Sequence, residues 1–277
     1  MSLQKVLQVS GLSKHFGGVR ALDGVDFSVP AGQCVALIGP NGAGKSTCFA
    51  CLAGQQVPTA GEVLWQGQAL LGKSPGERQR LGVARTFQVA QTFEALTVLQ
   101  NIQLVLRGAA PLAWWDWLDC RQPERALQLA AQAGLQHQAH ATVADLPYGA
   151  KKRLELAMAL AGLPEPGNEH GASLLLLDEP AAGLALAERG DMMALVRQVA
   201  SQGVTVLYTE HNMDAVFGVA DRVLVLMQGR LVADGLPAVV AQDPQVRERY
   251  LGMDFDLNTN VKTDAKTDAK GLLNAQG

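Results

Sequence analysis

The segment GPNGAGKST, at residues 39–47, combines the residue types and the spacing that hold a chain of phosphates. It fits the pattern G-x-x-x-x-G-K-S and lies between an apolar run and a helical one, the context that gives this pattern its meaning. Glycines let successive backbone N–H groups converge on phosphate oxygens, and the following helix start adds the positive end of its dipole. Lys45 would reach the β and γ phosphates, and Ser46 would offer its hydroxyl to Mg²⁺. The alternative, a glycine-rich turn without a ligand, is disfavoured by this context.

The residues predicted to line this phosphate site are Gly39, Asn41, Gly42, Ala43, Gly44, Lys45, Ser46 and Thr47.

Two adjacent carboxylates follow the apolar run in LLLLDEP. Asp178 comes at the carboxyl end of a predicted buried strand, where α/β sheets place ligand chemistry, and we expect it to hold Mg²⁺ through Ser46 or water. Glu179 follows directly and is placed to polarise an attacking water. An equally good alternative makes Glu179 an acid at a helix N-terminus ahead of Pro180, where it would complement the helix dipole.

A third segment, LPYGAKKRLELAMAL at residues 146–160, begins a predicted amphipathic helix with three cations, Lys151, Lys152 and Arg153. Cations at the positive end of a helix dipole reduce stability. Either this is a solvated helix start, or an anion binds there.

Composition limits the class of protein. The 277 residues are 48% hydrophobic with a net charge of −3, which allows a sizeable core and disfavours a general nucleic-acid binder. We expect the four cysteines to be free cytosolic thiols: Cys48 and Cys51 have C-x-x-C spacing, but they lie one turn apart in a predicted helix, which suits packing better than metal ligation. No signal peptide and no run of about 18 apolar residues is found, so we expect a cytosolic chain able to dock on a membrane partner.

Hydrophobic periodicity predicts the elements that position these residues. Strand-like runs at 5–12 and 24–29 predict an antiparallel edge, followed by a compact strand at 33–39 and a helix that ends at Gly54. The pattern is helical from about 91 to 160 and then alternates strand and helix to a hairpin at Gln228-Gly229. This alternation is typical of an α/β parallel sheet. The three tryptophans at 114, 115 and 117 favour a packed helix over a binding surface, and the tail from about 254 should be disordered.

Taken together, these motifs make residues 5–253 resemble the ATP-binding subunit of ABC transporters. The resemblance implies an α/β P-loop NTPase fold: an ABC-type RecA-like core with an antiparallel β subdomain and an inserted helical subdomain at about 91–160. It covers one domain, 1–253, and leaves a tail at 254–277. It also implies ATP and Mg²⁺ as cofactors, with 39–47 as the Walker A loop and Leu174 to Asp178 as the Walker B strand.

The resemblance gives further residues their roles. It makes Glu179 the catalytic base. RTFQ places Gln88 as the glutamine that senses Mg²⁺ and water and couples to the membrane subunit, and TEHN places His211 as the histidine that contacts the γ phosphate. KHFGG places Phe16 where the family stacks an aromatic ring on adenine. Taken singly, Gln88 would be a loop amide, His211 a surface histidine and Phe16 a core residue.

The segment LPYGA corresponds to the family's signature, usually LSGGQ, which faces the ATP of a second subunit. Two chains would sandwich two nucleotides, with the Gly149 N–H acting in trans. Pro147, Tyr148 and Ala150 depart from the usual residues. Tyrosine is common in the subgroup, but Pro147 removes a hydroxyl and an N–H. After Walker B, Ala185 replaces the usual aspartate or asparagine, which puts communication between the two sites in doubt.

ARTFQ, LPYG, LDEPAAGL and RERYLG resemble the ATPases of branched-chain amino acid importers. This implies a second ABC ATPase subunit, identical or not, two integral membrane permease subunits, a periplasmic binding protein acting indirectly, and no nucleic acid. The location would be peripheral, on the cytoplasmic face of the inner membrane. Importers of amides or urea would look similar. An ATPase acting on DNA or ribosomes fits this length poorly, and a nucleotide-dependent clamp with weak hydrolysis stays open because of Pro147 and Ala185.

Overall fold

The computed structural model describes residues 5–86, 92–107, 122–164 and 172–252. Gln88, the three tryptophans and the tail from 254 therefore lie outside the described residues. Among the residues that the structure describes, every helix is too short or too polar to span a bilayer.

A six-stranded sheet forms the centre of the molecule, in the order β10-β9-β3-β8-β7-β6. All neighbours are parallel except β10, which forms an antiparallel hairpin with β9. The predicted turn of this hairpin is confirmed, since Gln228 and Gly229 both adopt positive φ (49° and 77°). The strands are β3 (Cys34–Ile38), β6 (Val83–Arg85), β7 (Leu174–Asp178), β8 (Thr205–Thr209), β9 (Arg222–Met227) and β10 (Arg230–Gly235).

The central strands are apolar along their whole length because both faces of the sheet are covered. In β3, Cys34, Ala36 and Ile38 contribute to one hydrophobic core, whereas Val35 and Leu37 contribute to the other. The first core contains the helices α6 (Leu186–Ser201) and α7 (Met213–Phe217) and extends into the helical region.

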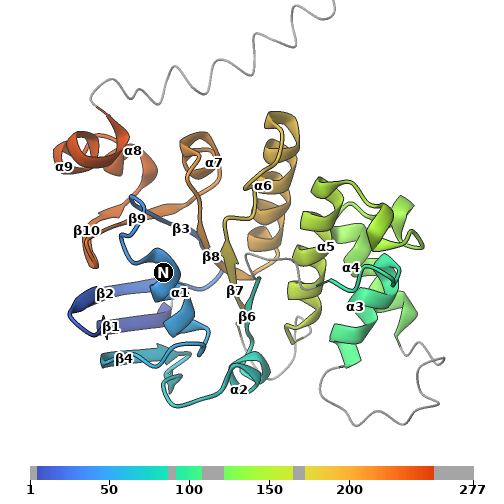
Figure 1. Ribbon diagram of the computed structural model, residues 1–277, viewed down its shortest axis with the longest axis horizontal. Coiled ribbons are helices and arrows are strands. Elements are labelled where there is room, and N and C mark those ends of the chain that lie inside the picture. Colours follow the sequence, from blue (N-terminus) through green and yellow to red (C-terminus); the bar gives the residue numbers. More distant parts are fainter. Residues whose placement is uncertain (1–4, 87–91, 108–121, 165–171, 253–277) are drawn as a thin grey trace, which may run out of the picture.

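The second core lies between the six-stranded sheet and a four-stranded antiparallel sheet in the order β2-β1-β4-β5 (Figure 1). Helix α1 (Lys45–Leu52) contributes the buried Cys48 and Cys51 to it, which confirms that these thiols pack in the core. Burial raises the pKa of the Cys48 thiol to about 12. The strands are β1 (Lys5–Phe16), β2 (Val19–Pro30), β4 (Ala60–Trp65) and β5 (Gln68–Ala69), with α2 (Pro75–Arg80) following.

The helical region predicted from periodicity lies to one side of the central sheet (Figure 1). Its apolar positions, spaced three and four residues apart, pack α3 against both α4 and α5. The elements are α3 (Val98–Arg107), α4 (Pro123–Gln132), the 3-10 turns η2 (Gln136–Gln138) and η3 (Val143–Asp145), and α5 (Tyr148–Ala161).

The chain closes with short helices beside β10, and the predicted helix within DPQVRERYLG is confirmed. Asp243 caps it by accepting hydrogen bonds from the amides of Gln245 and Val246. The elements are α8 (Pro237–Val240), α9 (Pro244–Val246) and the π-helical turn η4 (Arg247–Leu251).

Candidate nucleotide site

The loop at 39–47 connects the carboxyl end of β3 to α1, and two of its glycines are required by close backbone contacts. Gly39 has φ 149°, and a Cβ there would collide with the carbonyl oxygen of Leu226. Gly44 has φ 106°, and a Cβ there would collide with the carbonyl oxygen of Ala21. The loop is thus pressed against β9 and β2, and only glycine fits.

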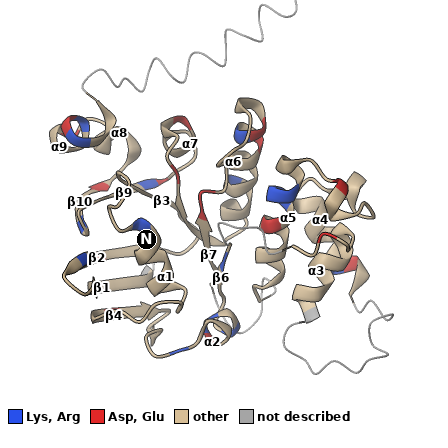
Figure 2. Ribbon diagram, viewed as in Figure 1, with Lys and Arg blue, Asp and Glu red and all other residues tan. Residues whose placement is uncertain are grey.

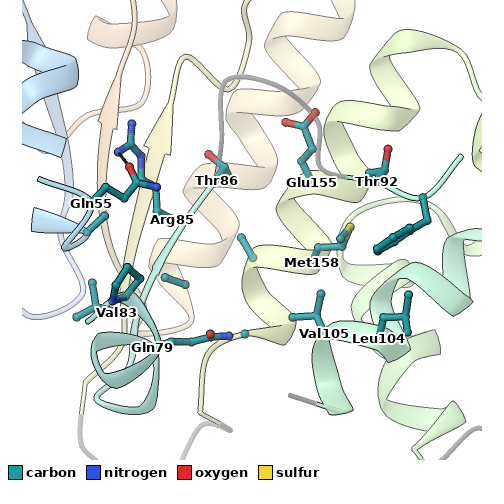
Figure 3. A pocket seen from close by; sticks show the side chains of 17 residues that line it. Gln55, Gln79, Val83, Arg85, Thr86, Thr92, Leu104, Val105, Glu155 and Met158 are labelled. Carbon is teal, nitrogen blue, oxygen red and sulfur yellow. Dashed lines mark hydrogen bonds between the residues drawn. The ribbon is translucent and has the colours of Figure 1, made fainter. Parts of the chain in front are cut away.

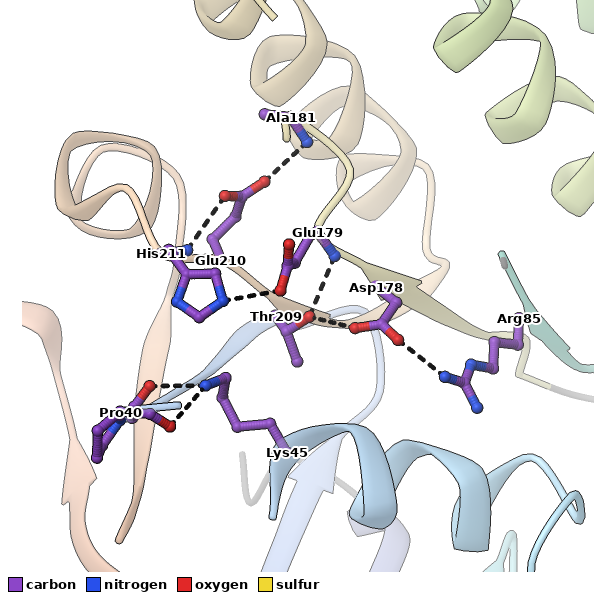
Figure 4. Close-up of polar contacts among 10 residues, drawn as sticks. Pro40, Lys45, Arg85, Asp178, Glu179, Ala181, Thr209, Glu210 and His211 are labelled. Atoms are coloured by element: carbon purple, nitrogen blue, oxygen red, sulfur yellow. Dashed lines mark hydrogen bonds and ion pairs between the residues drawn. The ribbon is translucent and has the colours of Figure 1, made fainter. Parts of the chain in front are cut away.

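The start of α1 has the properties of an anion site. Within the described residues, no side chain caps it and its first turn holds no acid, so the positive end of its dipole is not neutralised. The buried ammonium of Lys45 donates to the carbonyl oxygens of Gly39 (2.7 Å) and Pro40 (3.1 Å) (Figure 4). Burial lowers the pKa of Lys45, and the nearby charges of Glu179 and Asp178 oppose that shift. The loop therefore gathers positive charge beside two carboxylates.

Asp178 ends β7 and is 3% exposed. One of its carboxylate oxygens accepts a hydrogen bond from the Arg85 guanidinium at 2.8 Å, and the other accepts from the Thr209 hydroxyl at 2.8 Å (Figure 4). Its backbone N–H donates to Thr86 Oγ1 at 3.3 Å. Neighbouring strands β6 and β8 thus fix the carboxylate at the sheet edge that the loop also occupies.

Glu179 and His211 contact each other at this edge. Glu179 Oε1 lies 2.7 Å from His211 Nε2 (Figure 4). Glu179 has φ 50°, and its N–H donates to Thr209 of the neighbouring strand. The alternative that made Glu179 a helix N-terminal acid is wrong, because α6 begins only at Leu186. His211 is likewise more than a lone surface histidine, since the carboxylate holds its ring.

Sequence reasoning missed Glu210, whose carboxylate holds the backbone next to the Glu179–His211 pair. Its carboxylate is 3% exposed and accepts from the backbone N–H groups of Ala181 (2.7 Å) and His211 (3.3 Å). Burial raises the pKa of Glu210, and these two hydrogen bonds oppose the shift. Its position at the end of an apolar strand, next to His211, was a signal that could have revealed it.

Two aromatic residues are candidates for nucleotide contacts, Phe16 at the end of β1 and Tyr250 beside the loop. Phe16 is 47% exposed at the end of β1, with the Lys14 ammonium 4.9 Å from its ring centre, so the core alternative for Phe16 is wrong. Tyr250 was not predicted. It lines a cavity of about 280 Å³ together with Pro40 and His211, and its pKa is raised by burial against a hydrogen bond from the Gly39 backbone.

The signature-like segment begins α5 without a side-chain cap. Pro147 occupies the N-cap position and is exposed. The Tyr148 hydroxyl donates to the carbonyl oxygen of Ala182 at 3.3 Å. Gly149 is buried, and a Cβ there would lie 2.7 Å from a carboxylate oxygen of Glu188. The segment is therefore packed against the loop that leads into α6.

The three cations of α5 are engaged within the chain. Lys151 pairs with Glu94 at 3.2 Å, Lys152 with Glu155 at 3.1 Å, and Arg153 with Asp191 at 3.1 Å. Lys152 is buried. The sequence posed a choice between a solvated helix start and an anion site, and these contacts favour a third description, in which acids of the same chain neutralise the cations.

Ala185 is the N-cap of α6, and its N–H donates to Glu188 at 3.3 Å. The methyl side chain of alanine offers no hydrogen-bonding group, so the polar side chain expected here from the family is absent from this position.

A groove lies between the core and the helical region, with a volume of about 410 Å³ (Figure 3). Its lining is mainly apolar and includes Val83, Val105 and Met158. Arg85 and Glu155 are among the polar residues that line it.

A model of the ABC transporter family matches residues 22–182, which include the loop, Asp178 and Glu179. The chain belongs to the ABC transporter family. The match covers more than half of the chain, and the curated relatives extend it: this ABC chain is similar to the high-affinity branched-chain amino acid transport ATP-binding protein BraF of Pseudomonas aeruginosa, with 35% identity over 89% of this chain and 98% of BraF. It is also similar to LivG of Escherichia coli K12, with 36% identity over 90% of this chain and 98% of LivG.

Solved structures agree. A nucleotide-free ATP-binding cassette from an ABC transporter has a TM-score of 0.76 and 29% identity, covering 90% of this chain and all of that one. The ADP conformation of an ABC cassette has a TM-score of 0.77 and 29% identity, covering 90% and 99%. The chain is thus an ABC ATPase with the P-loop fold predicted from its sequence.

Proposed function

We propose that this chain hydrolyses ATP to power uptake of branched-chain or related amino acids through partner membrane subunits. One observation carries the proposal: a chain about 35% identical to BraF and LivG along nearly their whole length also brings Lys45, Asp178, Glu179 and His211 to one sheet edge. The relatives indicate the class of solute that is transported, and the geometry of the site indicates ATP hydrolysis.

The loop residues Gly39, Asn41, Gly42, Ala43, Gly44, Lys45, Ser46 and Thr47 bind the phosphates through backbone N–H groups and the lysine ammonium. Phe16, exposed at the end of β1, stacks on the adenine.

The residues present fit Mg²⁺, which prefers oxygen ligands. Ser46 is exposed at the helix start, and each Asp178 oxygen keeps a lone pair besides the hydrogen bond it accepts. Ser46, Asp178 and Gln88 would hold the ion, Gln88 lying outside the described residues. Bound Mg²⁺ would neutralise charge on the phosphates. Glu179 accepts a proton from the attacking water, and His211, oriented by Glu179 and Glu210, donates to the γ phosphate.

A second ABC ATPase subunit completes the site. The N–H of Gly149 at the start of α5 reaches the phosphate bound by the partner, aided by the helix dipole. Pro147 contributes no hydroxyl to that contact.

The groove beside β6 receives a segment of the permease. Its apolar walls and polar rim suit an amphipathic segment, and its lining includes Arg85 and Thr86, which both contact Asp178. The chain accordingly acts at the cytoplasmic face of the inner membrane, with two permease subunits, a periplasmic binding protein acting indirectly, and no nucleic acid.

The test is reconstitution of the complex in lipid vesicles with its permeases and binding protein. We expect ATP-dependent uptake of labelled leucine that unlabelled isoleucine and valine suppress and that acetamide and urea do not. Suppression by acetamide or urea alone would assign a different solute, and uptake independent of ATP would reject the motor function.

A clamp with weak hydrolysis is the second candidate, favoured by Pro147 and Ala185 at the interface side of the chain. It predicts that wild type hydrolyses ATP no faster than Glu179→Gln in the assembled complex. A wild type faster by two orders of magnitude rejects it.

A further inference from the structure

Arg85 connects the groove to the candidate metal ligand. It ends β6, and its side chain is 12% exposed. One terminal nitrogen donates to Asp178 at 2.8 Å, and the other donates to the side-chain oxygen of Gln55. The guanidinium carbon lies 5.9 Å from the centre of the Phe49 ring, which further restricts its position.

The two partners of Arg85 face different regions. Gln55 and Arg85 both line the groove (Figure 3), whereas Asp178 lies beside Lys45 and Glu179 at the nucleotide loop (Figure 4). The guanidinium of Arg85 therefore connects a residue of the groove with a residue of the nucleotide site. A lysine would not reproduce this arrangement, because one ammonium nitrogen replaces two nitrogens that a rigid planar group holds apart.

The same strand end makes a second connection. Thr86 lines the groove, and its hydroxyl oxygen accepts the backbone N–H of Asp178 at 3.3 Å. Displacement of the end of β6 by an occupant of the groove would thus move both supports of Asp178.

We propose that Arg85 is a positioning residue that transmits occupation of the groove by the permease to the placement of Asp178. This rests on the proposed function, because it takes the permease as the occupant. In this scheme an occupant of the groove contacts Gln55 and displaces the Arg85 guanidinium. The Asp178 carboxylate then moves, and its affinity for the metal ion changes.

A second arginine–aspartate pair provides a control, because a variant of it tests whether loss of any such pair has the same effect. Arg197 donates to Asp221 at 2.6 Å, and Asp221 in turn accepts the N–H of Cys34, at the amino-terminal ends of the strands. Arg197→Gln breaks an arginine–aspartate pair that is more exposed than Arg85–Asp178 and lies at the ends of the strands opposite the loop.

The experiment compares wild type, Arg85→Lys, Gln55→Leu and Arg197→Gln in the reconstituted transporter. The first readout is the number of leucine molecules imported per ATP hydrolysed, which unfolded molecules do not change because they do neither. The second is the Mg²⁺ concentration that half-saturates binding of a fluorescent non-hydrolysable ATP analogue, compared between the isolated subunit and the assembled transporter.

For wild type we expect assembly to shift the half-saturating Mg²⁺ concentration by at least about fivefold, the lower end of typical coupling between sites. Arg85→Lys and Gln55→Leu should reduce the shift to under about twofold and lower the leucine-to-ATP ratio about fivefold, whereas Arg197→Gln should retain both wild-type values. Gln55→Leu leaves the Arg85–Asp178 pair intact, so it tests the link even if Arg85→Lys folds poorly.

Wild-type values in both Arg85→Lys and Gln55→Leu would overturn the inference while leaving the proposed function standing. Failure of wild type itself to import solute, with no shift on assembly, would overturn the proposed function and this inference together.

Discussion

Helices α1 and α5 both begin where a phosphate is expected, yet their charges are arranged in opposite ways. At α1 no acid lies in the first turn, and the Lys45 ammonium bends back over its own loop. At α5 the three cations are paired with acids of the chain, and a Glu188 oxygen lies against Gly149. Figure 2 shows basic and acidic residues together on α5, whereas the start of α1 carries the Lys45 ammonium with no acid in its first turn. The backbone N–H groups and the dipole of α5 are therefore its expected contribution to a phosphate. The two helix starts therefore differ in whether their cations are already paired with acids of the same chain.

Glu179→Gln should give the largest effect, because it removes the proposed general base from the half-site where we propose that hydrolysis occurs. We expect ATP hydrolysis by the assembled transporter to fall about 10³-fold, with ATP binding retained. Phosphate release measures the rate, and the exposed Glu62→Gln serves as the control. A loss of hydrolysis below tenfold would show that Glu179 is not the general base.

Lys152→Met probes the buried pair at the other half-site. Removing Lys152 leaves the Glu155 side chain, only 11% exposed, without its cation and should lower the free energy of unfolding by about 3 kcal/mol at pH 7. Burial already raises the pKa of Glu155, so a proton binds the folded state more readily than the unfolded one. Stability then falls as pH rises above the ordinary carboxyl value, and lowering the pH toward 5 should recover part of the loss.

Denaturant unfolding at pH 5 and 7 measures this. The double variant Lys152→Met/Glu155→Leu is the control and should restore most of the stability, because it removes the uncompensated charge. If the double variant instead stays as unstable as the single one, packing rather than charge accounts for the loss.

Pro147→Ser sharpens the comparison by giving the signature half-site a side-chain donor. We expect ATP hydrolysis in the assembled transporter to rise about tenfold, below the roughly 10²–10³ that a fully placed donor contributes. The helix should also gain a cap, so thermal unfolding of the isolated subunit is measured in parallel. An unchanged rate would show that the missing hydroxyl does not limit this enzyme.

Lys151→Gln should give the smallest effect. The Lys151–Glu94 pair is at the surface, and such pairs contribute about 0–1 kcal/mol. We expect ATP hydrolysis to change less than about twofold and stability by less than about 0.5 kcal/mol. A tenfold loss of hydrolysis without unfolding would mean that this cation contacts a phosphate after all.

Local sequence determined most of the fold. Runs such as LLLLD predicted buried parallel strands, because a continuous apolar run fits only a strand covered on both faces. The phosphate loop could be predicted in full, since its glycines, lysine and following helix are neighbours in the chain and act through local backbone geometry. LPYG also led to the prediction that the family's signature lies at the start of α5; the structure places a helix start there, and the contact with a second subunit stays a prediction.

The contacts between distant segments could not be predicted in this way. Arg85 meets Asp178 across 93 positions of the chain, and Glu179 meets His211 across 32, because parallel strands bring their carboxyl ends to one edge only after crossing over. From the residues alone, the charges at the start of α5 indicated either a solvated helix start or an anion site. In the structure, Glu94 ahead of α3 and Asp191 of α6 pair with two of them. Residue types and local spacing determined which chemistry this protein can perform. Only the tertiary structure decided which charged side chains are free to contact a ligand, because ion pairing depends on distances in space that the order of the chain does not contain.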